Sequence, residues 1–250
     1  MYNPVKKAEE AIKIVCRGEM RKYYRFRPAK FYGGIATADC VGCNLRCLFC
    51  WSWHNIVNPG NIGFFCSPQQ VAEKVVKIAR KKRFRRIRIS GNEPTIARDH
   101  LVKVLEQIPG QFMFILETNG ILIGHDKTYA QDLARFENLY VRVSLKGANE
   151  EEFSTLTGAE PVGFELQIKA VENLHGAGVQ VHPAVMISFS SFDHVLALRK
   201  RLGKISREFE DIEVEELALY GDVEERLKKA KIECRTAYPP GDIPPEQIKS

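Results

Sequence analysis

Four of the seven cysteines in this chain fall within eleven residues of one another: Cys40, Cys43, Cys47 and Cys50. An odd number of cysteines with a tight cluster is typical of metal or redox chemistry and not of a disulfide framework. The spacing Cys43-x3-Cys47-x2-Cys50 offers three thiolates on one short loop, and three sulfurs can bind three irons of a [4Fe-4S] cluster. The fourth iron would stay open, so a substrate or cofactor could bind it through nitrogen and oxygen.

Zinc is the alternative metal for the same four thiols. Zinc ribbons also contain two Cys-x2-Cys pairs, but those pairs usually lie about 15–20 residues apart, whereas only three residues separate Cys43 from Cys47. The spacing therefore favours iron–sulfur chemistry, and a non-enzymatic zinc- and RNA-binding protein and a simple electron carrier remain the alternatives. The other three cysteines, Cys16, Cys66 and Cys234, are scattered and do not predict a second cluster.

The elements that must position this loop alternate between strand and helix. Apolar patterns and turn residues predict strands over residues 34–39, 85–90, 112–117, 139–145, 179–187 and 213–219. Helices are expected over residues 5–16, 67–82, 97–108, 127–136, 160–175, 191–202 and 223–231, and Ser67 and Pro68 form a typical helix start. Short connections between such elements mean parallel strands with right-handed crossovers in one domain. An open doubly wound sheet and a complete or partial barrel fit this alternation equally well.

Further polar residues collect where the predicted strands end. They are Gly91, Asn92, Glu93, Thr118, Asn119, Ser144 and Lys146, and the fifth strand itself carries His182. Parallel strands place their carboxyl ends on one face, and α/β enzymes build their sites there. We therefore expect these residues to surround the cysteine loop.

The composition is that of a globular protein of 250 residues, 44% apolar and 27% charged, with a formal charge of +6. It excludes a disordered or collagen-like chain. No apolar run approaches the roughly 20 residues that cross a bilayer, and charged residues interrupt any signal peptide, so we expect a cytoplasmic monomer with no membrane partner. The basic segments 17–30 and 80–86 permit RNA as a partner without favouring it.

The cysteine motif, the aromatic-rich loop after it and the segment from Gly91 to Thr95 together resemble the radical S-adenosylmethionine (SAM) superfamily over about residues 34–220. The resemblance implies an α/β fold whose core, residues 34–235, is a partial (β/α)6 TIM-like barrel of parallel strands. Residues 1–33 would then be an N-terminal basic and aromatic extension, and residues 236–250 a Pro-rich C-terminal tail.

The same resemblance implies a chemistry. Cys43, Cys47 and Cys50 would bind a [4Fe-4S] cluster, and S-adenosyl-L-methionine would chelate its fourth iron. A one-electron donor, ferredoxin or flavodoxin, would reduce the cluster, and SAM would be cleaved to methionine and a 5′-deoxyadenosyl radical that abstracts hydrogen from a substrate. An oxidoreductase of this kind is expected to need anaerobic conditions.

Two groups of residues match SAM-binding motifs of the superfamily. Gly91, Asn92 and Glu93 match its Gly-Gly-Glu-Pro segment, whose backbone receives the SAM amino group. Asn92 replaces the second glycine, and asparagine tolerates a positive φ better than most residues. Ser144 and Lys146 correspond to an Asp-x-Lys pair that contacts SAM, and Lys146 could pair with the methionine carboxylate.

Three further residues have weaker matches. By the same resemblance, Thr118 and Asn119 are expected to line the cofactor pocket, and His182 resembles a contact to the SAM adenosine. Plainer interpretations exist for two of them. Asn119-Gly120 is a common turn dipeptide, and a single histidine in an apolar run, such as His182, suits a protein core.

Within the superfamily, the sequence from Cys43 to Cys50 and the Glu-Pro-Thr segment are most similar to the activating enzymes of glycyl-radical proteins and their archaeal-type relatives. That similarity implies a protein substrate. Wybutosine-synthesis enzymes, which act on a tRNA base, also place a tryptophan after the third cysteine, as Trp51 does here. A glycyl-radical protein, a tRNA base and a small metabolite therefore all remain open as substrates.

Overall fold

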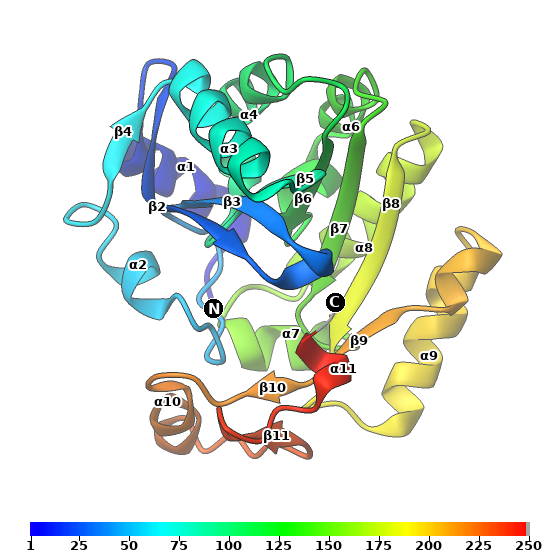
Figure 1. Cartoon of the computed structure of the whole chain (residues 1–250). Helices are drawn as coiled ribbons and strands as arrows, with labels where there is room; N and C mark the ends of the chain where they lie inside the picture. The colour runs from blue at the N-terminus through cyan, green and yellow to red at the C-terminus, as the bar shows by residue number, and fades with distance from the viewer. Residues whose placement is uncertain (249–250) are drawn as a thin grey trace.

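The structure, a computed structural model, describes residues 1–248. At its centre six neighbouring strands run parallel (Figure 1). They are β3 (Ile35–Cys40), β5 (Arg86–Ser90), β6 (Met113–Thr118), β7 (Leu139–Leu145), β8 (Gln180–Met186) and β9 (Glu213–Glu215). Their order follows the chain without reversal, whereas a doubly wound sheet reverses its order at a switch point. The fold is therefore the partial (β/α)6 TIM-like barrel, and the doubly wound alternative is wrong.

Helices lie before, between and after the parallel strands along the chain (Figure 1). They are α1 (Pro4–Val15), α2 (Trp53–Val57), α3 (Pro68–Lys82), α4 (Arg98–Leu105), α5 (Ile121–His125), α6 (Lys127–Leu133), α7 (Glu150–Thr157), α8 (Val162–Gly176), α9 (Phe192–Gly203), α10 (Val223–Lys229) and α11 (Pro245–Ile248). The start of α3 is as predicted, because Ser67 is its N-cap and exchanges hydrogen bonds with Gln70, and Pro68 is its first residue.

Two predicted elements differ from the structure. The sixth strand is interrupted after β9, and β10 (Leu217–Ala218) pairs instead with β11 (Ala237–Tyr238) in a separate two-stranded sheet. The ladder stops because the Leu217 amide donates to the Ser188 hydroxyl (2.8 Å) and not to a backbone carbonyl of β8. The tail, expected to be extended, contains α11, and its last two residues, 249–250, lie outside the described residues.

The N-terminal segment adds strands to the edge of the barrel. β2 (Met20–Ala29) pairs antiparallel with β3, and β1 (Cys16–Arg17) and β4 (Phe64–Cys66) pair with β2. Figure 1 shows β2 passing across the front of the barrel, so this segment is part of the barrel wall. The division of the chain at residue 34 remains a prediction.

The two faces of the parallel sheet differ in polarity. Outward side chains such as Ile87, Phe114 and Val143 are fully buried in the main hydrophobic core. Inward side chains are polar along several strands, among them Asp39, Arg88, Ser90, Glu117, Arg142 and Ser144. A polar interior cannot close by hydrophobic packing alone, so the barrel holds a cavity that suits a charged ligand.

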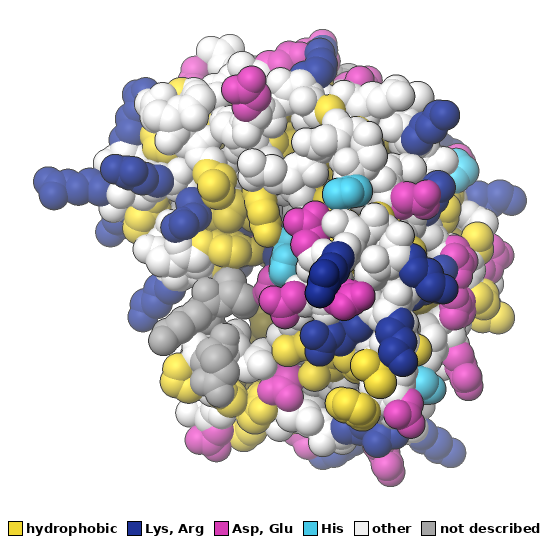
Figure 2. Space-filling model, turned by 90° about the vertical axis from the view of Figure 1, so that its right-hand side faces the viewer, with side chains coloured by type: hydrophobic (Ala, Val, Ile, Leu, Met, Phe, Trp, Pro, Cys, Tyr) yellow, Lys and Arg dark blue, Asp and Glu magenta, His cyan; other side chains and the backbone are white. Residues whose placement is uncertain are grey.

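Among residues 1–248, no helix combines the length and the apolar character needed to cross a membrane. The face drawn in Figure 2 carries basic and acidic side chains intermixed. The basic run 80–86 is mostly exposed and lies before β5, at the end of that strand away from the cysteine loop, as expected for a solvated surface.

Candidate active site

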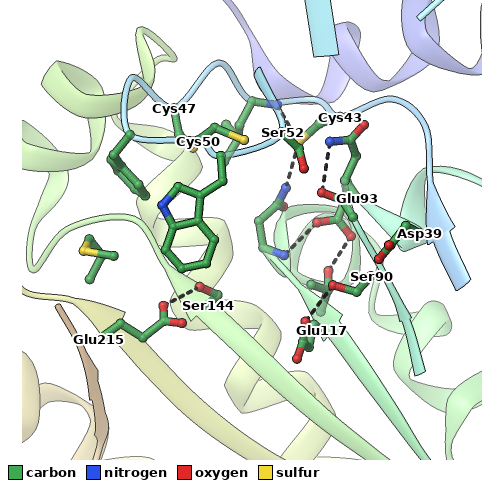
Figure 3. A pocket seen from close by; sticks show the side chains of 18 of the residues that line it. Asp39, Cys43, Cys47, Cys50, Ser52, Ser90, Glu93, Glu117, Ser144 and Glu215 are labelled. Carbon is green, nitrogen blue, oxygen red and sulfur yellow. Dashed lines mark hydrogen bonds between the residues drawn. The ribbon is translucent and has the colours of Figure 1, made fainter. Parts of the chain in front are cut away.

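A cavity of about 710 Å³ lies inside the barrel at the carboxyl ends of the strands. Figure 3 shows the cysteine loop along one side of it and residues of the strands along the other. Of the residues predicted from the sequence, the cavity is lined by Cys43, Cys47, Cys50, Gly91, Asn92, Glu93, Thr118, Asn119, Ser144 and Lys146. His182 is absent from its wall. The structure therefore brings together every predicted site residue except His182.

The donor set fits a cluster of several irons better than a single metal ion. The three loop thiols are free and border one cavity. Within the described part of the chain, no three His, Cys, Asp or Glu side chains are placed to hold one metal ion, as a zinc site would require. Cys40, the fourth thiol of the zinc alternative, is fully buried on β3 and does not line the cavity.

Burial dominates the electrostatics of the thiols. It raises the pKa of Cys43, Cys47 and Cys50, that of Cys47 to about 12. At Cys43 the negative charge of Glu93 adds to this effect, whereas at Cys47 and Cys50 the positive charge of Lys146 opposes it. Thiolates are the form that binds metal, so iron must supply the positive charge that ionises these groups.

The cysteine loop is held from both sides by residues that the sequence did not single out. The Arg226 guanidinium on α10 donates to the carbonyl oxygens of Leu48 (3.0 Å) and Cys50 (2.6 Å). On the other side the Leu48 amide donates to the Leu156 carbonyl at 2.9 Å. The loop therefore has a defined backbone, and its thiols are oriented in advance.

Glu93 ties the ends of β5 and β6 together. Its carboxylate accepts hydrogen bonds from the hydroxyls of Thr95 and Thr118, both at 2.6 Å, and from the Asn119 amide at 2.7 Å. The Glu93 amide in turn donates to the Gly42 carbonyl at 3.0 Å. The side chain is thus engaged with the protein, and it fixes the loops that border the cavity.

The backbone of the Gly91–Asn92 pair differs from the expectation. Gly91 has the left-handed conformation, with φ of 96°, whereas Asn92 is not among the residues with positive φ. A side chain at Gly91 would begin 3.0 Å from the Asp39 Cα, so glycine is required there. The Asn92 side chain accepts from the Gly42 amide (2.9 Å) and donates to the Gly91 carbonyl (3.0 Å). It therefore links this segment to the cysteine loop.

Asn119 serves both as a turn residue and as a wall of the cavity. Gly120 is the N-cap of α5, with φ of 77°, and the Asn119 side chain accepts a hydrogen bond from the Ile121 amide at 3.1 Å, as in an Asx turn. The Asn119 side-chain amide donates to Asn44 Oδ1 at 2.7 Å, and Asn44 is fully buried in the cysteine loop. The end of β6 and the cysteine loop are therefore joined directly.

Lys146 presents a cation to the cavity. Its ammonium group donates to the Ser144 hydroxyl at 2.6 Å, and that hydroxyl donates to Glu215 at 3.2 Å (Figure 3). Among residues 1–248, no carboxylate forms an ion pair with Lys146. Its charge is therefore available to an anionic ligand.

His182 lies deeper in the barrel than expected for a SAM contact. It is the register partner of Arg142, and its Nε2 lies 3.3 Å from the Glu213 carboxylate. Burial alone would raise the pKa of Glu213, but hydrogen bonds from His182 and Arg142 outweigh it and lower this pKa to about 2. The structure thus places His182 beside the Arg142–Glu213 ion pair and not in the cavity wall.

Arg21 on β2 is a buried residue that sequence reasoning missed. Its side chain is 1% exposed, and it donates to the carbonyl oxygens of Glu93 (2.6 Å) and Pro94. No carboxylate in the described chain pairs with it. A buried guanidinium without an anionic partner is costly, so its hydrogen bonds to the Glu93 loop are its evident role.

The charged inner wall was also missed, although its signal is present in the sequence. Arg88 pairs with Glu117 at 2.6 Å, and Arg142 pairs with Glu213 and Glu215 at 2.6 and 3.0 Å. Charged residues alternate with apolar ones along these strands, and this period of two marks a polar face. A strand that faces a packed core would not keep such residues inward.

The barrel holds a polar cavity and three free thiols at the carboxyl ends of its strands, an arrangement that suits an enzyme with an iron–sulfur cluster. The chain matches the radical SAM superfamily over residues 39–202 and belongs to it. Members of this superfamily use a [4Fe-4S] cluster and SAM and need an electron donor, so the chain is a radical SAM enzyme.

Among curated proteins, the chain is similar to two archaeal proteins named probable GTP 3′,8-cyclase. It is 31% identical to the one from Methanosarcina acetivorans over 58% of this chain and 42% of that protein. It is 28% identical to the one from Methanococcus vannielii over 69% of this chain and 57% of that protein. The chain thus spans about half the length of these relatives, and they are not glycyl-radical activating enzymes.

Among solved structures, the fold is similar to Streptococcus suis SuiB bound to precursor peptide SuiA. The TM-score is 0.56 at 17% identity, over 82% of this chain and 48% of that one. A second neighbour is native anSMEcpe with bound AdoMet, with a TM-score of 0.52 at 21% identity, over 70% of this chain and 48% of that one. At these identities the likeness establishes the fold.

Proposed function

We propose that Cys43, Cys47 and Cys50 hold the [4Fe-4S] cluster of this enzyme, and that the Gly91–Glu93 segment, Asn119 and Lys146 bind SAM. When bound and reduced by an external donor, the cluster supplies the electron that cleaves SAM to methionine and a 5′-deoxyadenosyl radical. The observation that supports this assignment is that three free thiols and the predicted SAM-binding residues border one cavity.

The protein side chains orient the bound molecules and exclude water. The Lys146 ammonium group donates to the Ser144 hydroxyl and, within residues 1–248, forms no ion pair, so it can bind the methionine carboxylate of SAM by a charge-assisted hydrogen bond. Glu93 and Asn92 hold the loop that carries the amino-group site, through the contacts to Asn119 and Gly42. Because these contacts exist within the protein itself, little reorganisation is needed when SAM binds.

We further propose that the substrate is a small polar molecule of the nucleotide class. The inner wall below the thiols consists of charged and hydroxyl side chains, which suit sugar, base and phosphate groups better than an apolar ligand. The similarity to proteins named probable GTP 3′,8-cyclase supports the same class. The hydrogen atom that the radical removes would then come from a ligand inside the barrel.

Activation of a glycyl-radical protein is the second candidate, and the motif from Cys43 to Cys50 favours it. The rim of the cavity argues for the smaller substrate. Trp51 and Tyr220 are partly exposed, line the cavity and pack edge to face with their centroids 5.0 Å apart. The Trp51 indole also donates to the Ala218 carbonyl at 2.8 Å. These two aromatic side chains leave less room at this part of the wall for a protein loop than for a small ligand.

The test is anaerobic reconstitution with iron and sulfide, followed by dithionite and SAM. We expect 5′-deoxyadenosine as a product, with formation stimulated by GTP and not by a glycine-containing peptide. Cys47→Ala should abolish the product, whereas Cys234→Ala, a cysteine outside the loop, should leave it unchanged. Absence of 5′-deoxyadenosine from a fully loaded wild-type protein would refute SAM cleavage, and stimulation by the peptide alone would favour the second candidate.

A further inference from the structure

Two arginines face the barrel interior from β2, which is the strand that the N-terminal segment adds next to β3. Arg25 and Arg27 alternate along β2 and therefore lie on the same side of the sheet. In the antiparallel pairing with β3, Arg25 lies opposite Asp39 and Arg27 lies opposite Thr37. Both arginines and Asp39 line the cavity. This part of the wall is contributed by residues before the cysteine loop.

Both guanidinium groups bind the same carboxylate oxygen. Arg25 Nε lies 2.7 Å and Arg27 Nε 2.8 Å from Asp39 Oδ2. The Asp39 side chain is 1% exposed, whereas those of Arg25 and Arg27 are 50% and 29% exposed. The contact to Asp39 uses only the Nε donor of each arginine, so their terminal amino groups remain for a ligand apart from a hydrogen bond between Arg25 and Tyr24. Asp39 thereby fixes two guanidinium groups side by side.

The charges at this corner do not cancel. One carboxylate faces two guanidinium groups, and within residues 1–248 neither arginine forms an ion pair with a second acid. The other inner-wall arginines are balanced differently: Arg88 pairs with Glu117, and Arg142 has two glutamates. The β2–β3 corner is therefore net positive, unlike the neutral Arg88–Glu117 pair and the net negative group of Arg142 with its two glutamates.

We propose that Arg25 and Arg27 bind a phosphate group of the substrate. This inference rests on the proposed function, because it concerns the ligand of the same cavity. Two guanidinium groups present more donors than the two oxygens of a carboxylate can accept, whereas a terminal phosphate offers three oxygens and a charge near −2. The Arg25 guanidinium also lies 5.3 Å from the centre of the Tyr24 ring, which restrains its orientation.

A purely structural role would not need this arrangement. A cross-strand ion pair between β2 and β3 is complete with one arginine, and a second one at the same oxygen adds an unbalanced charge. Both arginines also line the cavity, and the Arg25 side chain is half exposed, so a ligand in the cavity can reach them. The pair therefore anchors the anionic end of a substrate whose reacting part lies toward the cysteine loop.

The test measures the binding of inorganic pyrophosphate and of GTP to the reconstituted holoenzyme by anaerobic calorimetry at constant ionic strength. The variant is Arg25→Gln/Arg27→Gln. The matched control, Lys81→Gln/Arg85→Gln, removes the same charge from the exposed basic run. A triple variant that adds Asp39→Asn avoids leaving a buried carboxylate without a partner. It can replace the double variant if the double variant does not fold. SAM affinity is measured in parallel.

We expect the double and triple variants to bind pyrophosphate and GTP at least about tenfold more weakly than the control, with SAM affinity unchanged. Equal pyrophosphate affinity in the variants and the control would overturn the proposal. An equal loss of SAM affinity and pyrophosphate affinity in the variants would also overturn it, because the arginines would then bind SAM. Binding is measured without turnover. A protein that cleaves SAM but shows no arginine-dependent anion binding would refute this inference alone.

Discussion

The Arg226 side chain donates a hydrogen bond of 2.6 Å to the carbonyl oxygen of Cys50, which lies 176 residues earlier in the chain. It donates a second one to the Leu48 carbonyl and packs over the Trp53 ring at 5.0 Å. A helix near the C-terminal end thus fixes the backbone between the second and third proposed cluster ligands. The cysteine loop does not hold its shape alone.

We therefore expect Arg226→Ala to destabilise the bound cluster. Loss of two charge-assisted hydrogen bonds frees the loop carbonyls and should accelerate cluster loss to an anaerobic chelator by about tenfold or more. The visible absorbance of the cluster, followed over time, measures this rate. Lys228→Ala on the same helix, at a side chain 74% exposed, is the control. Equal rates in the two variants would show that α10 does not support the loop.

Arg21→Met should weaken SAM binding without preventing cluster assembly. The substitution removes the donors that hold the Glu93 and Pro94 carbonyls, and thus loosens the proposed amino-group site. We expect the SAM dissociation constant to rise about tenfold while iron content stays at the wild-type level. Arg17→Met, an exposed residue of the neighbouring strand β1, should change neither quantity. Unchanged SAM affinity in Arg21→Met would contradict the positioning role.

Asn92→Gly restores the family residue and should nevertheless impair the protein. The Asn92 side chain connects the Gly42 amide to the Gly91 carbonyl, and glycine cannot. We expect SAM affinity to fall by about three- to tenfold, as for the loss of one or two ordinary hydrogen bonds. Asn61→Gly, in an exposed loop, controls for added backbone freedom. An affinity at or above the wild-type value would mean that the link to the cysteine loop is dispensable.

Local patterns in the sequence predicted most of the barrel, because each strand is an apolar or alternating segment between turns or helices. The cysteine spacing and the polar residues after the strands likewise predicted site residues that line the cavity, all except His182. Contacts between distant segments were not predictable. The bonds from Arg226 to Cys50 and from Arg21 to Glu93 depend on tertiary packing. The interruption between β9 and β10 depends on a side chain, Ser188, that competes with the strand ladder.

The contacts of the N-terminal segment were likewise not predictable from the sequence. Its basic and aromatic composition predicted neither its pairing with β3 nor the inward direction of Arg25 and Arg27, because antiparallel register is set by the partner strand. The charged inner wall, in contrast, was predictable in principle. Asp39, Arg88 and Arg142 alternate with apolar residues in strands that otherwise look fully buried, and such alternation indicates a ligand-facing surface.

His100 makes the folded state sensitive to acid. Its side chain is 4% exposed and lies beside the Glu19 carbonyl (2.7 Å, at Nδ1) and the Tyr23 hydroxyl (3.0 Å, at Nε2). A carbonyl only accepts, so Nδ1 carries the proton, and the neutral ring accepts from Tyr23 at Nε2. Burial lowers the pKa of His100 from 6.5 to about 4.

In the unfolded chain His100 takes up a proton below its ordinary pKa of 6.5, whereas the folded protein resists protonation down to about pH 4. Protonation therefore favours unfolding between these values. The stability that neutral His100 provides is complete above pH 6.5 and declines by about 3 kcal/mol as the pH falls to 4. His100→Asn keeps a donor for the Glu19 carbonyl but does not titrate, so its stability should lack this decline.

Urea unfolding of both proteins, prepared without the cluster, measures the effect. Other groups titrate equally in the two proteins and cancel in the difference between their free energies of unfolding. We expect the variant to be less stable at neutral pH, because its smaller side chain packs less well and loses the Tyr23 bond. The difference in free energy of unfolding between the wild-type protein and the variant should narrow or reverse by pH 4. His175→Asn, at a side chain 43% exposed, should show no such trend. If the difference in free energy of unfolding does not depend on pH, His100 is readily protonated in the folded state.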